Sequence, residues 1–491
     1  MAFIDGSAVN VALPVLQRDL NASAANAQWV IESYSLFLSA LMLTGGSLGD
    51  VYGRRAAFAA GIAIFAVASF ACALAPNVEV LIAGRSLQGI GGALATPGSL
   101  ALLSANFSGP ARGRAIGTWS GFSAITAALG PVLGGWLVQI GSWRWVFIIN
   151  LPLAVLVLAI VALRVDESRD AAASPALDLW GAALATAGLG ALVYGLIRLQ
   201  NATLDVLGVV SSAVGLALLV AFVLVERRAR HPMVPLDLFA SRTFRAANAY
   251  TFLLYATLGG GFYFIPFDLI NVQGYPPSEA GAALLPFIAI MFAFSRFSGG
   301  LVERIGPRIP LATGAALAAC GFCVFAFAGV GHSYWTSFFP GAVLLGCGGA
   351  LFVAPLSTTV MDAVTVSHAG IASGVNNAVS RVAGLIAIAV LGIALANAFE
   401  ARLTATLGHA RISVTSRAAI ARERAAIVTG DVPAGIVTAD RPIVGSAIRG
   451  AFAEGFRVAM LVSAFLALAA ALVGLDRSFS AASFRATSPS R

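Results

Sequence analysis

Residues 45–55 read GGSLGDVYGRR and close a long apolar run with glycines, one acid and two arginines. A weaker copy, GGLVERIGPR, occupies residues 299–308. The positions Gly46, Leu48, Asp50, Gly53 and Arg55 recur as Gly299, Leu301, Glu303, Gly306 and Arg308, always at the same spacing. A repeat over this distance predicts a chain built from two related halves.

The composition predicts an integral membrane protein. Of 491 residues, 59% are hydrophobic and 11% charged, and the mean hydropathy is +0.88. The formal net charge is +8, and every basic residue is arginine. The arginines lie in short gaps between apolar runs, which favours a role in membrane topology over nucleic-acid binding. Without lysine the chain has neither a P-loop nor a Schiff-base site.

Fourteen long apolar runs can be counted, and each predicts a helix because lipid tolerates no unpaired backbone. They are 1–17, 28–48, 56–75, 79–105, 114–138, 145–163, 179–199, 206–226, 247–270, 279–300, 309–329, 335–359, 369–397 and 451–475. The first run, FIDGSAVNVALP, ends at Pro14, so we expect either a truncated first helix or a start codon placed too far downstream. A basic n-region is missing, so we expect no signal peptide.

The arginines also predict the orientation. With both termini cytoplasmic, the short outer loops hold only Arg18, Arg144 and Arg198, and most other loop arginines lie inside, as the positive-inside rule requires. Residues 398–450 would then be an arginine-rich outer loop. Its stretch RISVTSRAAIARERAAIV fits either an amphipathic surface helix or a solvated loop.

The repeat sets the domain organisation. Its first copy follows the second predicted helix and its second copy follows the tenth, so two helices are inserted between two six-helix halves. This 6+2+6 arrangement gives an N-terminal half at 1–163 and a linker with two helices at 164–246. The C-terminal half spans 247–477, with the outer loop 398–450, and a cytoplasmic tail follows at 478–491.

The opening stretch resembles the loop 2–3 signature of the major facilitator superfamily, an all-α integral membrane fold. The matching residues are Gly46, Gly49, Asp50, Gly53, Arg54 and Arg55. The resemblance implies a conformational latch that holds the two halves together in one state; the alternative is a simple topology-setting turn. Glu303, Gly306 and Arg308 would form the second, less complete latch, in which Val302 and Pro307 replace Gly49 and Arg54.

Three further stretches resemble the fourteen-helix drug:proton antiporter family. FIDGSAVNVALP resembles its first helix, with Ile4 where the family has leucine, and RSLQGIGGALATPG resembles its fourth. Residues 117–137 resemble the antiporter signature of the fifth helix, with Thr126 in place of one glycine. The helix kink of that signature is intact here as Gly130, Pro131, Gly134 and Gly135.

Charges inside apolar helices are costly, and each therefore needs a reason. Asp5 and Arg85 form the leading pair: a buried carboxylate beside an arginine can gain or lose a proton, which is the basis of proton coupling. The alternative is a static ion pair. Glu32 belongs either to the same proton pathway or to the interface beside Tyr34.

Other polar residues are candidates for a central cavity. Asp268 faces either that cavity or the outer interface. Arg381 lines the cavity with Asn376 and Asn377, or is a hydrogen-bonded packing residue. Four cysteines lie in apolar runs without nearby ligands, so we expect neither a metal site nor a cofactor.

We therefore predict a secondary active exporter of small amphipathic, drug-like compounds, working by proton antiport through alternating access. Its partners are the substrate, protons and the lipid bilayer, with no nucleic acid; a monomer is the simplest expectation. An alanine- and arginine-rich chain without lysine favours a bacterial inner membrane. One alternative is a dedicated exporter of a metabolite, lipid or siderophore. A transporter-like sensor or membrane enzyme would need a catalytic constellation or a soluble domain, and we do not expect this chain to be an enzyme.

Overall fold

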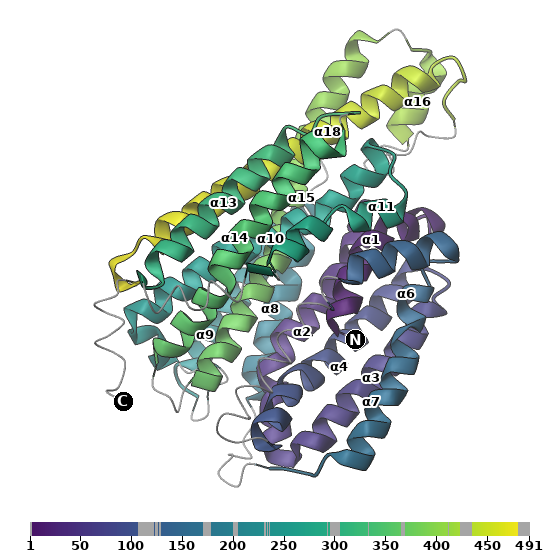
Figure 1. Ribbon diagram of the computed structural model, residues 1–491. Helices are drawn as coiled ribbons and strands as arrows, with labels where there is room; N and C mark the ends of the chain where they lie inside the picture. Colours follow the sequence, from purple (N-terminus) through teal and green to yellow (C-terminus); the bar gives the residue numbers. More distant parts are fainter. Residues whose placement is uncertain are drawn as a thin grey trace.

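The computed structural model is helical throughout the residues it describes (Figure 1). These are residues 2–106, 122, 126, 129–169, 178–199, 205–229, 232, 234, 236–291, 293–294, 305–331, 333–364, 369–410, 412–422 and 435–479. The N-terminal half contains α1 (Ala2–Asp19), α2 (Ala24–Tyr52), α3 (Arg54–Ala73), α4 (Val78–Asn106), Leu129–Ile140, α6 (Trp145–Ile148) and α7 (Asn150–Arg164). The C-terminal half contains α10 (Arg242–Phe267), the π-helical turn η2 (Asp268–Val272), α11 (Pro277–Ala282), α13 (Arg308–Ala326), α14 (Tyr334–Asp362), α15 (Ala369–His409) and α18 (Arg441–Gly474).

The two halves form separate bundles that meet along one contact, which we call the seam. On one side of the seam lie α1, α2 and the helix Leu129–Ile140, and on the other lie α10, α11 and α15. Within the described residues, nine helices are long and apolar enough to cross a membrane. The protein is therefore a multi-pass membrane protein, while the count of fourteen spanning helices and the cytoplasmic termini stay predictions.

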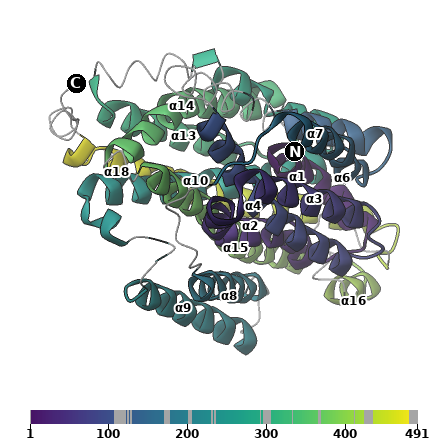
Figure 2. The same cartoon turned by 90° about the horizontal axis from the view of Figure 1, so that it is seen from below.

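The predicted insertion is a helical pair, α8 (Leu179–Arg198) and α9 (Val206–Glu226). Asp178 and Asp205 cap the two helices by accepting hydrogen bonds from the amides of Gly181 and Leu207. Figure 2 shows the pair at the edge of the bundle. Helix α8 joins the core there through an apolar cluster with α2 and α15.

The first helix extends past the apolar run that ends at Pro14. It runs from Ala2 to Asp19, close to the predicted span 1–17, and includes Pro14 in its interior. A proline removes one backbone hydrogen bond but does not have to end a helix that is packed on its neighbours.

Residues 398–450 are also more helical than the predicted loop. Helix α15 continues to His409, α18 already begins at Arg441, and α16 (Val414–Arg422) lies between them. Asp440 joins these parts: its Oδ2 accepts hydrogen bonds from the hydroxyls of Ser413 and Ser416, at 2.6 and 2.7 Å. These bonds hold the pKa of the Asp440 carboxyl below its usual value. The segment projects from one end of the bundle (Figure 1).

Candidate functional site

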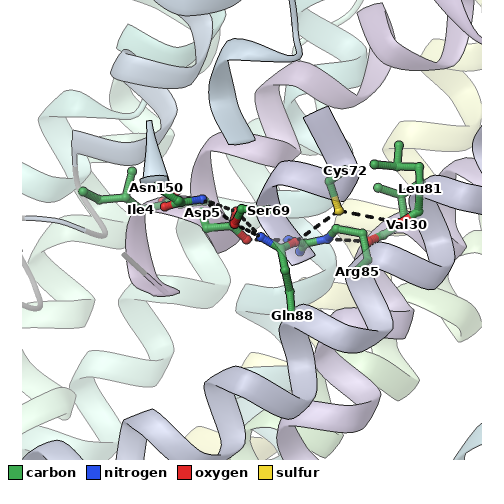
Figure 3. Close-up of polar contacts among 10 residues, drawn as sticks. Ile4, Asp5, Val30, Ser69, Cys72, Leu81, Arg85, Gln88 and Asn150 are labelled. Atoms are coloured by element: carbon green, nitrogen blue, oxygen red, sulfur yellow. Dashed lines mark hydrogen bonds and ion pairs between the residues drawn. The ribbon is translucent and has the colours of Figure 1, made fainter. Parts of the chain in front are cut away.

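The Asp5 carboxylate lies at the centre of a buried polar network built by four helices (Figure 3). Its Oδ2 forms an ion pair with Nη1 of Arg85 on α4. Its Oδ1 accepts hydrogen bonds from the Asn150 amide of α7 at 2.9 Å and from the Gln88 amide of α4 at 3.2 Å. The Gln88 amide also donates to the hydroxyl of Ser69 on α3 at 2.6 Å. Asp5, Arg85, Gln88, Asn150 and Ser69 are all 0% exposed.

Arg85 is held on several sides. Its Nε donates to the carbonyl of Val30 on α2 at 3.0 Å, and its Nη1 also donates to Oε1 of Gln88 at 2.8 Å. Its guanidinium carbon lies 4.3 Å from the centre of the Tyr34 ring, which adds a cation–π contact. The other terminal nitrogen, Nη2, is buried and has no hydrogen-bond partner in the described part of the chain.

Helix periodicity and small residues build this network. Arg85 and Gln88 are three residues apart on α4, as are Ser69 and Cys72 on α3, so each pair shares one helix face. Glycines let α4 approach its neighbours closely. A Cβ on Gly89 would lie 2.6 Å from the carbonyl oxygen of Tyr34, and one on Gly84 would lie 2.6 Å from the Cys72 sulfur.

Arg85, Gln88 and Asn150 all donate to the Asp5 carboxylate, so this one acid joins α1 to α4 and α7. The structure thus brings the predicted Asp5–Arg85 pair together, while its role in coupling stays a prediction.

Glu32 is a second buried acid, but it belongs to a different place. It lies on α2, is 0% exposed, and both of its carboxylate oxygens lack hydrogen-bond partners among the described residues. It lies within electrostatic range of Tyr263 on α10 of the other half. Glu32 therefore faces the seam and is not part of the Asp5 network.

The four predicted cavity residues have separate neighbours. Asp268 accepts a hydrogen bond from Gln273 at 3.1 Å, and Gln273 in turn binds the backbone of Gly329 and Gly331, which follow α13. Asn376 donates to Asn248 and Thr251 of α10, within the C-terminal half.

Asn377 is exposed, whereas Arg381 is half-buried and lies near Tyr34 of α2 and Tyr255 of α10. Of the four residues, Arg381 is the one that the electrostatic contacts place at the seam.

The predicted latch is partly visible. Gly53 lies between α2 and α3 with φ of 123°, and its counterpart Gly306 precedes α13 with φ of 75°, so the repeat preserves a turn that favours glycine. An acid does face the start of α3, but it is Glu167, whose carboxylate accepts from the amides of Arg55 and Ala56 at 3.0 and 3.1 Å. Glu303 lies outside the described residues, and of Asp50 only the backbone is described.

The predicted antiporter kink forms one side of the seam. Cβ atoms on Gly130 and Gly134 would clash with Ser7 and Ala8 of α1. A Cβ on Gly135 would lie 2.3 Å from the carbonyl oxygen of Pro277 on α11. A Cβ on Gly281 of α11 would likewise lie 2.2 Å from the carbonyl oxygen of Pro131. The backbones of the two halves therefore touch where these glycines lie.

Gln88, Asn150 and Glu167 were not predicted. Neutral polar residues are common in membrane helices, so Gln88 and Asn150 carry no signal without their neighbours. Gln88 could have been found from its position three residues after a buried arginine. Glu167 had no local signal, because the amides that it caps are more than 100 residues earlier in the chain.

Comparison with known proteins agrees with this geometry. The family model described as Major Facilitator Superfamily matches residues 1–388. The chain belongs to the major facilitator superfamily. This is a family of membrane transporters, as the resemblance of the opening stretch implied.

Similar proteins include exporters of drugs. The chain is 36% identical over 474 residues to the Multidrug resistance protein Stp of Mycobacterium tuberculosis, covering 94% of this chain and 87% of that protein. It is 34% identical over 487 residues to the Tetracenomycin C resistance and export protein of Streptomyces glaucescens, covering 97% of this chain and 89% of that protein. It is 32% identical over 410 residues to the Drug efflux pump JefA of Mycobacterium tuberculosis, covering 83% of this chain and 80% of that protein.

A solved structure shares the fold. A bacterial homologue of the human lysosomal transporter Spinster, in an inward-facing and unoccupied conformation, superimposes with a TM-score of 0.69 at 18% identity. The alignment covers 99% of this chain and 96% of that one. At this identity the likeness shows the fold alone.

Proposed function

We propose that this protein is a secondary active exporter of small amphipathic, drug-like compounds that exchanges substrate for protons by alternating access. The observation that carries the proposal is the Asp5–Arg85 pair, sealed inside the N-terminal half with Gln88 and Asn150. The names of the relatives, which are resistance and export proteins, support drugs as the substrate class. The bacterial inner membrane and cytoplasmic termini belong to the same proposal.

Proton binding at Asp5 would change what its neighbours do. The protonated acid no longer balances Arg85, and the guanidinium then attracts another acceptor or repels a bound cation. A cationic substrate and a proton would therefore be bound in alternation. Because Asp5, Asn150 and Arg85 lie on α1, α7 and α4, protonation also loosens the contacts between these helices.

The seam provides the moving part. Its glycine contacts join the halves at the end that carries the α15–α16–α18 segment (Figure 1), which the arginine distribution predicts to be outside. The described arrangement then has its outer side closed. Opening would separate Gly135 from Pro277 and Gly281 from Pro131, and the turn at Gly53 would act as the latch on the opposite side.

Dye efflux tests the proposal. Bacteria without their own efflux pumps would express the chain, be loaded with a fluorescent lipophilic cation, and be energised with and without a protonophore. We expect efflux that the protonophore abolishes and that Asp5→Asn reduces to background. Asp19→Asn is a matched control on the same helix, because Asp19 pairs with Arg144 at the partly exposed end of α1.

The outcomes separate the parts of the proposal. Full proton-coupled efflux by Asp5→Asn would remove Asp5 from the mechanism. Export of one metabolite and no dyes by folded protein would favour the dedicated exporter. Size-exclusion profiles of each variant in detergent show whether a loss reflects misfolding.

A further inference from the structure

Arg381 is a cation on α15 whose neighbours come from both halves. Its side chain is half-buried, and the groups within electrostatic range are the hydroxyls of Tyr34 on α2 and Tyr255 on α10. Gly259 and Gly384 bring α10 and α15 together one turn further on, where a Cβ on Gly259 would lie 2.7 Å from the Gly384 Cα. This close approach places Arg381 and Tyr255 at the same level of the two helices.

No acid of the described chain neutralises Arg381. It forms no hydrogen bond or ion pair with any residue that the structure describes. Asp5 on α1 is paired with Arg85. Glu32, the buried acid of α2, lies within electrostatic range of Tyr263 and not of Arg381. A charge in a membrane interior needs a partner, and the described part of the chain supplies none for Arg381.

Tyr34 lies near two arginines, Arg85 and Arg381. The Arg85 guanidinium lies over its ring, and Arg381 lies within range of its hydroxyl. One nitrogen of Arg85, Nη2, also has no hydrogen-bond partner among the described residues. Because Asp5 balances Arg85, Arg381 is the charge near Tyr34 that has no counter-ion among the described residues. Such a charge attracts a negative group more strongly than it would in water.

We infer that Arg381 binds the carboxylate of an amphipathic substrate, beside the rings of Tyr34 and Tyr255. The guanidinium is planar and presents two parallel N–H groups, which match the two oxygens of a carboxylate. The tyrosines supply apolar ring faces for the rest of the compound and hydroxyls beside its charge. This inference rests on the proposed function, because it names the class of compounds that the exporter accepts.

A matched pair of dyes tests it. A rhodamine free acid and its methyl ester share one aromatic cation and differ in the carboxylate. Uptake of each into inside-out vesicles, driven by an imposed proton gradient, gives the ratio of acid to ester transport. We expect Arg381→Gln to lower that ratio about tenfold, the effect of losing one charged hydrogen-bonding partner. Arg381→Lys keeps the charge without the planar fork and should give an intermediate ratio.

Arg457→Gln is the control, because Arg457 lies on an exposed face of α18 beside Glu454. It should leave the ratio as in the wild type. An unchanged ratio in Arg381→Gln would overturn the inference, and so would the loss of both dyes by a folded variant. If the wild type carries the ester and not the acid, the inference fails while the proposed function stands. If the folded wild type carries neither dye, the proposed function fails and the inference with it.

Discussion

The interior of the N-terminal half and the seam both contain buried charge, but they treat it differently. In the interior, Asp5 is surrounded by donors from α4 and α7 and by the guanidinium of Arg85. At the seam, Glu32 and Arg381 lie near tyrosines and have no ion-pair partner in the described chain. The two proposals made above follow this difference: the paired Asp5 would respond to protonation, and the unpaired Arg381 would bind the substrate.

Removing Arg85 should have the largest effect on stability and is the strongest test of this comparison. Arg85→Met keeps much of the volume but leaves the Asp5 carboxylate buried with only its amide donors. Loss of one partner of a buried ion pair costs about 3–5 kcal/mol of unfolding free energy. Denaturant unfolding in detergent measures it. The double variant Asp5→Asn/Arg85→Met should regain a large part of the loss, and additive losses would show that the two side chains do not act as a pair.

The seam should respond to bulk more than to charge. In Gly135→Leu the new side chain collides with the Pro277 carbonyl, and the strain is about 1–3 kcal/mol if the halves stay together. We expect the halves to be held apart, so that dye efflux is lost while the protein still folds. Gly450→Leu is the control, since that glycine of α18 has no atom within 4 Å of its Cβ position. Equal efflux by the two variants would mean that the glycine contact does not guide transport.

A smaller change sharpens the description of the interior. Asn150→Leu removes one donor to Asp5 and should lower the unfolding free energy by about 1.5–3 kcal/mol, the range for a hydrogen bond to a charged group. Asn106→Leu, at the exposed end of α4, should have little effect.

Glu32→Gln should have the smallest effect on stability. The Glu32 carboxylate has no donor in the described chain, so a neutral amide of the same shape removes no ion pair. We expect an unfolding free energy within about 1 kcal/mol of the wild type, whereas Asp5→Asn lowers it clearly. A drop as large as that of Asn150→Leu would reveal a partner for Glu32 and would end the distinction between the two regions.

The sequence predicted the parts of this molecule whose signal is local. A charge within an apolar run is conspicuous, and Asp5 and Arg85 were therefore found and paired. The glycine turn at Gly53 was found because its counterpart Gly306 repeats it. Gln88, Asn150 and Glu167 were missed because their roles depend on helices that are distant in the chain.

In the segment 398–450 the predicted helix ends differ from the observed ones. Its boundaries were placed where hydropathy falls, but hydropathy measures compatibility with lipid and does not measure helix formation. Helices α15 and α18 continue past the apolar stretch, and Asp440 at the start of α18 binds the start of α16. Arginines on the exposed faces of such helices are compatible with helix and incompatible with lipid, so the helix ends could not be read from the loss of apolar residues.

Helix α8 also bears on how a compound arrives from the lipid. Leu189, Val193 and Ile197 of α8 pack against α2 of one half and α15 of the other, and thus cover the line where the two meet. A lipophilic molecule dissolved in the bilayer meets an apolar wall on that flank. Entry of such a molecule into the protein from that flank would require α8 to move. The inserted pair therefore makes the two flanks of the transporter unequal as entry routes from the bilayer.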